Sequence, residues 1–519
     1  MNSFKARKPK SYIISIDIGT SFIKAGLYDD SGNCIEVIQE KIPQKYIDNG
    51  ALEQHGDDFV RILLETLKSL MEKTDACSKS VKVIAFTGQM AGAIGVDKEW
   101  NAVTIWSGTM DTRQNSIMEG QIDNENILLQ SGTNLPFMAK KIKWFEKEYA
   151  HTISKVVKYV GLSSYVIGKI TGIKVEDAFL GSTYLTWTGL ADIENRRWSE
   201  ELCSMFNIDI KRLPHIVEST AIVGRLSRSV ASLCGLLEGT PVVAGAGDKI
   251  AGCIGAGAVE AGIMVDECAS LSAISLCTDH YRPDIKNRTL ETLPSAIPGQ
   301  YFSLFFISGS GLVIDWFIDN FAQEEKKSAA ANGTTAYKIL DEKSEKIAPG
   351  SDNLLCIGLL SGRALPFDPN IRGMWIGHSL IHSKAHFYRS LLESYAYEYK
   401  HCLGIMKETS GALPFLRVRV IGGGGASSNL WNKIKTNVLA IPYDQLERED
   451  CALLGTAIIG GTGIGMFNDI ADTARKFISI KNAYEVENKI AEKYSKLAVL
   501  YSQTIEKNKE IFEKLTFRG

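Results

Sequence analysis

Residues suited to binding a phosphate group come together near the start of the sequence. The segment Asp17-Ile18-Gly19-Thr20-Ser21 follows a β-branched run and is itself followed by Lys24. Glycine lets backbone amides approach an anion, the hydroxyls of Thr20 and Ser21 add donors, and Lys24 adds a positive charge. Asp17 could hold Mg²⁺ through water, because Mg²⁺ loses its own waters reluctantly. A plain β-hairpin with a glycine turn is the alternative interpretation.

A second candidate is an aspartate in a glycine-rich bend, Gly245-Ala246-Gly247-Asp248-Lys249. The apolar run 242–246 predicts a buried strand, so Asp248 would project into whatever cleft the domains enclose. An aspartate in that place can take the proton of an alcohol as the alcohol attacks phosphorus. Asp248 could equally cap the helix that follows, and the two roles are compatible.

Two further strand ends open into small residues. The segment Thr87-Gly88-Gln89-Met90-Ala91-Gly92 could line a small-molecule pocket or form a tight turn between strands. The four glycines at 422–425 would let the backbone lie flat against a ring or a phosphate, and a helix that starts near Ser428 would present free amides. This segment has neither the P-loop pattern nor the dinucleotide fingerprint, and a flexible surface loop is the alternative.

Three histidines, His378, His382 and His386, recur at the spacing of one helical face. They lack the His-Glu-x-x-His pattern of a zinc enzyme, and residues 373–380 favour a strand over a helix. The three side chains therefore need not share one helix, and we expect no metal site there.

The predicted elements alternate between strands and helices, which is typical of α/β domains. We expect strands at residues 12–20, 23–28, 81–86, 242–246 and 418–421, and helices at 57–71, at 384–406 and within 484–515. A chain of 519 residues is about twice as long as one hydrophobic core usually supports, so it should form two domains. The glycine-rich stretch 245–262 is the predicted hinge, which gives domains 1–262 and 263–519.

Composition narrows the classes of function. Lys and Arg number 58 and Asp and Glu number 60, so the net charge of −2 argues against a nucleic-acid partner. The apolar segment 301–317 is interrupted by serines, glycines and Asp315, so we expect no membrane span. The ten cysteines include no Cys-x-x-Cys pair, which favours free thiols and a cytoplasmic location. Whether the chain forms a homodimer stays open.

Taken in order, these segments resemble the FGGY carbohydrate kinases, which belong to the superfamily of sugar kinases, actin and heat-shock chaperones. Residues 16–21 resemble the first phosphate motif of the family, and 88–92 resemble the Gly-Gln-Met-His-Gly of xylulokinases, with Ala91 in place of His. Gly247-Asp248-Lys249 is similar to Gly-Asp-Gln, whose aspartate is the family's catalytic base. Further matches are Gly50-Ala51-Leu52-Glu53-Gln54, Asp111-Thr112-Arg113, and residues 368–373 and 422–431.

The resemblance implies an α/β fold in which two ribonuclease H-like domains, of the actin and sugar kinase superfamily, flank a central cleft. It implies phosphate transfer from ATP to a ketopentose such as xylulose or ribulose, or to a related ketose or polyol, with Asp248 as general base. The sugar would contact Gln89, Met90, Ala91, Asp111 and Asp248. Asp17 would hold Mg²⁺ through water, and ATP would contact Thr20, Ser21, Lys24, Ser270, Gly311, Gly424, Ser428 and Asn429.

The sequence also departs from the family at places that bear on function. Glycerol kinases carry Arg-Glu where this chain has Met90-Ala91, which disfavours glycerol as substrate. Lys249 stands where Gln is usual, and its charge could favour an anionic or differently hydroxylated substrate. Cys268-Ala269-Ser270 lie where the second phosphate motif is usually Gly-Thr-Ser. Two alternatives therefore stay open: a non-catalytic or nucleotide-gated sugar-binding protein on the same scaffold, and a kinase relative that has lost activity.

Overall fold

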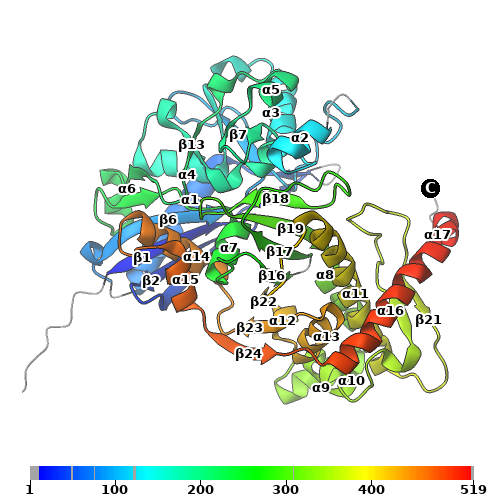
Figure 1. Cartoon of the computed structure of the whole chain (residues 1–519). Coiled ribbons are helices and arrows are strands. Elements are labelled where there is room, and N and C mark those ends of the chain that lie inside the picture. The colour runs from blue at the N-terminus through cyan, green and yellow to red at the C-terminus, as the bar shows by residue number, and fades with distance from the viewer. Residues whose placement is uncertain are drawn as a thin grey trace, which may run out of the picture.

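The chain forms two α/β domains, each built around a mixed β-sheet (Figure 1). The computed structural model describes residues 11–47, 51–74, 76–120, 124–269, 271–307 and 309–515. Gly50 and Ser270, two positions named in the sequence analysis, lie outside these described residues. We call the part of the molecule around the large sheet whose strands precede residue 262 the first lobe. The part around the large sheet whose strands follow residue 262 is the second lobe. The predicted two-domain α/β fold is confirmed.

The sheet of the first lobe has six strands in the order β14-β15-β6-β1-β2-β3. Strands β1, β2 and β3 form an antiparallel meander, β6 and β15 run parallel to β1, and β14 closes the edge antiparallel to β15. The bounds are β1 Tyr12–Ile18, β2 Phe22–Asp29, β3 Cys34–Lys41, β6 Val81–Gly88, β14 Ile222–Arg225 and β15 Pro241–Val243. Strand β1 ends before the expected Thr20, because the Gly19 amide already turns back to the Phe22 carbonyl at 3.0 Å.

The sheet of the second lobe repeats this connectivity and adds one edge strand. Its order is β18-β19-β17-β16-β22-β23-β24, with β16, β17 and β19 as the antiparallel meander and β22 and β23 parallel to β16. The bounds are β16 Ile263–Cys268, β17 Ser272–Thr278, β18 Glu291–Pro294, β19 Tyr301–Ile307, β22 Arg417–Gly422, β23 Tyr443–Leu446 and β24 Ile480–Tyr484. Strand β16 therefore corresponds to β1, and the two lobes have equivalent cores.

Helices cover the sheets, and short strand pairs decorate both lobes. The helices of the first lobe are α1 Gly56–Lys73, α2 Asn124–Ser131, α3 Phe137–Glu148, α4 Leu162–Thr171, α5 Glu200–Met205, α6 Arg228–Cys234 and α7 Asp248–Gly255. Those that follow are α8 Ser310–Phe321, α9 Gln323–Asn332, α10 Ala336–Ser344, α11 Lys384–Ser410, α12 Gly424–Ser427, α13 Asn429–Leu439, α14 Cys451–Gly463, α15 Ile470–Phe477, α16 Asn488–Lys507 and α17 Lys509–Leu515. The smaller strands are β4 Lys45–Tyr46, β5 Leu52–Glu53, β7 Gly92–Val96, β8 Ser107–Gly108, β9 Lys158–Val160, β10 Phe179–Gly181, β11 Ala191–Asp192, β12 Arg197–Trp198, β13 His215–Val217, β20 Leu355–Ile357 and β21 Met374–Ile376.

A pair of crossing helices forms the layer between the two sheets. Helix α7 follows β15 and shares a core cluster with β16 and β17 of the second lobe, through Ile250 and Ile254. Helix α14 comes from the second half of the chain but packs on β1 and β6 of the first lobe, and Figure 1 shows it, in orange, beside β1 and β2. The two halves of the chain are thus interlocked, and the domain limits 1–262 and 263–519 stay a prediction.

Strand alternation decides which side chains face this central layer. In β1, Ile14, Ile16 and Ile18 pack with α1 in one cluster, whereas Ile13 packs with α14 in another. Side chains two residues apart share a face, so Asp17 lies on the same side as Ile13, toward α7 and α14. None of the helices among the described residues has the length and apolar character needed to span a bilayer.

Candidate active site

The end of β1 carries Asp17, and the turn into β2 carries the hydroxyl residues Thr20 and Ser21. Strands β1 and β2 form a hairpin in which Asp17 pairs with Lys24 in register. The hairpin and the phosphate-binding interpretations are therefore compatible. Burial raises the pKa of Asp17 to about 7, and the negative charge of Asp248 adds to that rise. A carboxylate with a raised pKa gains most from a nearby cation.

Three glutamine side chains hold this turn from behind. Gln54 Nε2 donates to the Thr20 carbonyl at 2.9 Å, and Gln89 Nε2 donates to the Gly19 carbonyl at 3.1 Å. Gln44 Nε2 donates to Ser21 Oγ at 2.9 Å and to the Thr20 carbonyl at 3.4 Å. The carbonyl oxygens of the turn are thus occupied by protein donors, which fixes its conformation before any ligand arrives.

Asp248 is the first residue of α7, directly after the glycine bend. Gly247, not Asp248, is the N-cap, and the Asp248 carboxylate accepts the Lys249 amide at 2.7 Å. The capping alternative is therefore wrong for Asp248 itself. Burial raises the pKa of Asp248 to about 6, against the lowering effect of Lys249. A carboxylate with this pKa is deprotonated at neutral pH. Its pKa also lies near the working pH, as an effective general base requires.

The bend that delivers Asp248 depends on glycine. Gly245 has φ +72°, and a Cβ there would lie 1.7 Å from the Phe86 carbonyl oxygen. A Cβ on Gly247 would lie 2.5 Å from Met90 Sδ. The chain therefore passes tightly over the end of β6 because both positions lack a side chain, which explains why β15 ends at Val243 and not at the expected residue 246.

The predicted sugar residues lie in the first lobe, with their polar groups already engaged. Gln89, Met90 and Ala91 are buried, and Gln89 Oε1 accepts Trp106 Nε1 at 3.4 Å. The Asp111 carboxylate accepts Ser107 Oγ at 2.7 Å and Arg113 Nε at 2.8 Å. These contacts lower the pKa of Asp111 against the effect of its burial. Asp111 thus stabilises the wall of the site, and direct contact with a sugar stays a prediction.

A buried lysine beneath this wall was missed by sequence reasoning. Lys141 on α3 donates to Ser107 Oγ at 3.0 Å, to the Gly108 carbonyl at 2.8 Å and to the Asp111 carbonyl at 3.1 Å. Burial lowers the pKa of Lys141 to about 7. A lysine in an amphipathic helix gives no sign in the sequence that it points inward.

The predicted nucleotide residues of the second lobe line one cavity. Gly311, Gly424, Ser428 and Asn429 all border a cavity of about 950 Å³. The alternative of a flexible surface loop is wrong for residues 422–429, which form the end of β22, α12 and the start of α13. A Cβ added to Gly423 or Gly424 would meet no atom within 4 Å, so the bare backbone faces open space there. Thr20, Ser21 and Lys24 lie in the other lobe and do not border this cavity.

Side chains in this cavity are held by one another. Ser428 Oγ accepts the Trp431 amide at 3.1 Å and donates to Asp341 at 2.6 Å, and Asn429 Oδ1 accepts the Tyr484 hydroxyl at 2.5 Å. Burial raises the pKa of Asp341 to about 6. Asp341 on α10 was missed because no motif marks it, and only the packing of α10 beside α13 brings it here.

Comparison with known proteins assigns this arrangement to a family. Residues 12–255 match the model of the FGGY family of carbohydrate kinases, N-terminal domain, and residues 274–464 match that of the C-terminal domain. The chain belongs to the FGGY family of carbohydrate kinases. It is accordingly an enzyme of the class that transfers phosphate to a sugar.

Relatives of this FGGY kinase cover nearly its whole length. It is 25% identical over 508 residues to the xylulose kinase of Bacillus subtilis (strain 168), covering 96% of this chain and 98% of that protein. It is 26% identical over 502 residues to the gluconokinase of Bacillus licheniformis, covering 95% of each chain. The crystal structure of a ligand-bound xylulose kinase from Lactobacillus acidophilus has the same fold, with a TM-score of 0.86 and 20% identity, over 98% of this chain and all of that one.

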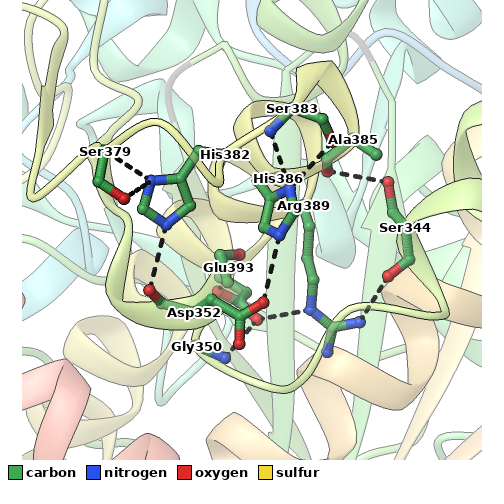
Figure 2. Close-up of polar contacts among 11 residues, drawn as sticks. Ser344, Gly350, Asp352, Ser379, His382, Ser383, Ala385, His386, Arg389 and Glu393 are labelled. Carbon is green, nitrogen blue, oxygen red and sulfur yellow. Dashed lines mark hydrogen bonds and ion pairs between the residues drawn. The ribbon is translucent and has the colours of Figure 1, made fainter.

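Two histidines of the triplet, His382 and His386, make hydrogen bonds within the second lobe of this FGGY kinase (Figure 2). His386 lies on α11, whereas His378 and His382 precede that helix, so the three do not share one helical face. The Ser379 and Ser383 amides donate to Nδ1 of His382 and His386, at 2.8 and 3.0 Å. The Nε2 atoms lie 3.1 Å from the Asp352 carbonyl oxygen and 3.2 Å from its carboxylate. All four ring nitrogens of His382 and His386 are thus engaged in hydrogen bonds.

Proposed function

We propose that this FGGY kinase phosphorylates a hydroxyl group of a small sugar with ATP as donor and Asp248 as general base. The observation that carries the proposal is Asp248 itself, a partly buried carboxylate with a pKa of about 6 at the start of α7, between the two lobes. The sugar would bind on the first lobe near Gln89 to Ala91, and the nucleotide base and ribose would occupy the cavity of the second lobe. With the domain limits that we propose, residues 1–262 would bind the sugar and supply the base, and residues 263–519 would bind most of the nucleotide.

In the reaction, the acceptor oxygen of the sugar forms a bond to the γ-phosphorus while the bond from that phosphorus to the bridging oxygen of ADP breaks. Asp248 takes the proton that the hydroxyl loses. The Gly19–Ser21 turn, fixed by Gln44, Gln54 and Gln89, would present the amides and hydroxyls of Thr20 and Ser21 to the phosphates. Lys24 adds positive charge next to Asp17.

The donor set at the site fits Mg²⁺. Burial and the charge of Asp248 both raise the pKa of Asp17, which means that they destabilise its charged form. A nearby cation would stabilise that charged form. No group of three or more metal-binding side chains occurs among the residues the structure describes. Mg²⁺ usually keeps several of its waters and binds through one or two carboxylates and the substrate phosphates. Asp17 would hold Mg²⁺ through water, and the bound ion would neutralise charge on the phosphate oxygens.

Ketopentoses such as xylulose or ribulose are the first substrates to test, and the gluconokinase relatives make gluconate the second. The experiment measures sugar-dependent release of ADP for a panel of ketoses, polyols and aldonates, with phosphorylated product identified by mass spectrometry. We expect at least one ketose or sugar acid to raise the rate well above that of ATP alone. Nucleotide binding without any sugar-dependent turnover would support the non-catalytic alternative.

A further inference from the structure

Lys249, the residue after the base, reaches from one lobe to the other. It lies in the first turn of α7, and its ammonium forms an ion pair with the carboxylate of Glu267 on β16 of the second lobe. The side chain of Lys249 is 24% exposed and that of Glu267 is 34% exposed, so the pair is partly accessible to solvent.

The position of Glu267 explains where this ammonium lies. Glu267 is the residue before the last in β16, and it pairs with Ala273 of β17 and Ile421 of β22. Asp17 is the residue before the last in β1, the strand of the first lobe that corresponds to β16. The two carboxylates therefore occupy equivalent places at the ends of equivalent strands, and Lys249 extends toward the second of them.

The charges around the base are strongly unbalanced. Glu267 and Asp450 raise the pKa of Asp17, and Glu267 also raises the pKa of Asp248. The site thus holds four carboxylates, those of Asp17, Asp248, Glu267 and Asp450. The positive charges that lower the pKa values of Asp17 and Asp248 are those of Lys24 and Lys249. Desolvation opposes the charge of Lys249, but the attraction of Glu267 and Asp248 outweighs it and raises the pKa of Lys249. Its ammonium therefore stays charged at neutral pH.

We propose that Lys249 is a catalytic residue that transfers its contact from Glu267 to the migrating phosphoryl group. The proposal rests on the proposed kinase function and assigns to Lys249 the neutralisation of charge on the phosphoryl oxygens. As the sugar oxygen bonds to phosphorus and the bond to ADP breaks, the electron pair of that bond goes to ADP and the proton goes to Asp248. Lys249 keeps its protons throughout, and Glu267 holds it in place until the triphosphate enters.

A simple latch between the lobes is the competing explanation, and the two make opposite predictions. In a latch, Lys249 and Glu267 are equal partners, so removing either one has the same effect. If Lys249 contacts the phosphoryl group, Lys249→Gln removes a charge that the transition state needs, whereas Glu267→Gln only frees that charge.

The experiment compares Lys249→Gln, Glu267→Gln and the double variant with the full-length wild type, using the best sugar of the panel. Lys73→Gln, which breaks the Lys73–Glu36 pair on the surface of the first lobe, is the matched control. We expect Lys249→Gln and the double variant to lose about a hundredfold in kcat with less than about threefold change in the KM for ATP. Glu267→Gln should lose clearly less in kcat than Lys249→Gln, because it removes the partner that positions Lys249 but keeps the positive charge, and Lys249→Arg should recover part of the loss.

A binding measurement gives a second readout that does not need turnover. ADP with aluminium fluoride mimics the migrating phosphoryl group, so Lys249→Gln should bind it at least about tenfold more weakly while binding ADP alone normally. Equal losses in Lys249→Gln and Glu267→Gln, or unchanged affinity for the analogue, would overturn the proposal. If Asp248→Asn abolishes turnover and Lys249→Gln does not, the role of Lys249 fails and the kinase function stands. If no sugar supports turnover by the wild type, the kinase proposal fails first and takes this one with it.

Discussion

Gly255 and Gly455 face each other where α7 crosses α14. A Cβ on Gly255 would lie 1.8 Å from the Cys451 carbonyl oxygen, and a Cβ on Gly455 would lie 1.9 Å from the Ala251 carbonyl oxygen. The backbones of the two helices are therefore in direct contact. Because α7 carries Asp248 at its first residue, this contact also sets the position of the base relative to the second half of the chain.

Gly455→Ala should therefore destabilise the protein and impair catalysis together. Overpacking of a close contact costs about 1–3 kcal/mol, and the helices must separate to admit the methyl group. Gly404→Ala on α11 is the matched control, because a Cβ there meets no atom within 4 Å and the change removes a helical glycine. Thermal unfolding and kcat check both variants. A Gly455→Ala protein as stable and active as Gly404→Ala would contradict the contact.

Asp248→Asn should retain the fold and ATP binding but lose at least about a hundredfold in kcat, because the amide cannot accept the proton. Asp469→Asn is the control, since Asp469 is the N-cap of α15 and accepts the Asp472 amide at 2.8 Å, a role that Asn also fills. Steady-state kinetics and calorimetric titration with ATP measure the two effects. Near-normal turnover of Asp248→Asn would remove Asp248 from the role of base.

The pH dependence should show an acid limb at about pH 6. Asp248 has a raised pKa of about 6, and a base works only when deprotonated, so kcat/KM should rise as pH increases through that value. Glu267→Gln should move this limb to lower pH, because the charge of Glu267 raises the pKa of Asp248. Profiles of kcat/KM from pH 4.5 to 9 test both statements, and an unmoved limb in Glu267→Gln would count against the assignment to Asp248.

Gln54→Leu should weaken ATP binding without abolishing the fold. The Gln54 amide donates to the Thr20 carbonyl at 2.9 Å, and losing one such hydrogen bond costs about 1 kcal/mol, or roughly fivefold in KM for ATP. Gln130→Leu is the control, because Gln130 bonds to Asn126 and Glu201, away from the turn. An equal rise in the KM for ATP in both variants would show that the effect does not come from the turn.

Glu291 should make stability depend on pH. It lies on β18, is 5% exposed and accepts Trp187 Nε1 of the first lobe at 3.1 Å. Burial raises its pKa to about 7, from about 4.5 in the unfolded chain, so the folded state holds the proton more tightly. The resulting stability is complete below about pH 4.5 and is lost as pH rises through 7, by on the order of 3 kcal/mol at most.

Glu291→Gln should remove that part of the pH dependence, since the amide does not titrate. Thermal unfolding of wild type and variant between pH 5 and pH 8 measures it. The melting temperature of the wild type should fall relative to that of the variant as the pH rises. Parallel curves for the two proteins would contradict the raised pKa of Glu291.

The local sequence pattern was enough to predict many of the strands and several residues of the candidate site. The alternation of β1 places Asp17 on the face away from Ile14 and Ile16, and the glycines around Asp248 mark a bend that carries a carboxylate. These features depend on residues next to one another in the chain, so their spacing and backbone freedom can be inferred directly from the sequence. The ordered set of such segments was also sufficient to predict the family.

Contacts between distant segments were decided only by the tertiary structure. Helix α14 packs on the sheet of the first lobe, although it lies in the second half of the chain. Gln54 reaches the Thr20 carbonyl, and Lys249 pairs with Glu267 across the lobes. The spacing of residues in the sequence does not reveal these partners. Whether a polar side chain faces solvent or contacts a distant segment depends on how the two halves of the chain cross.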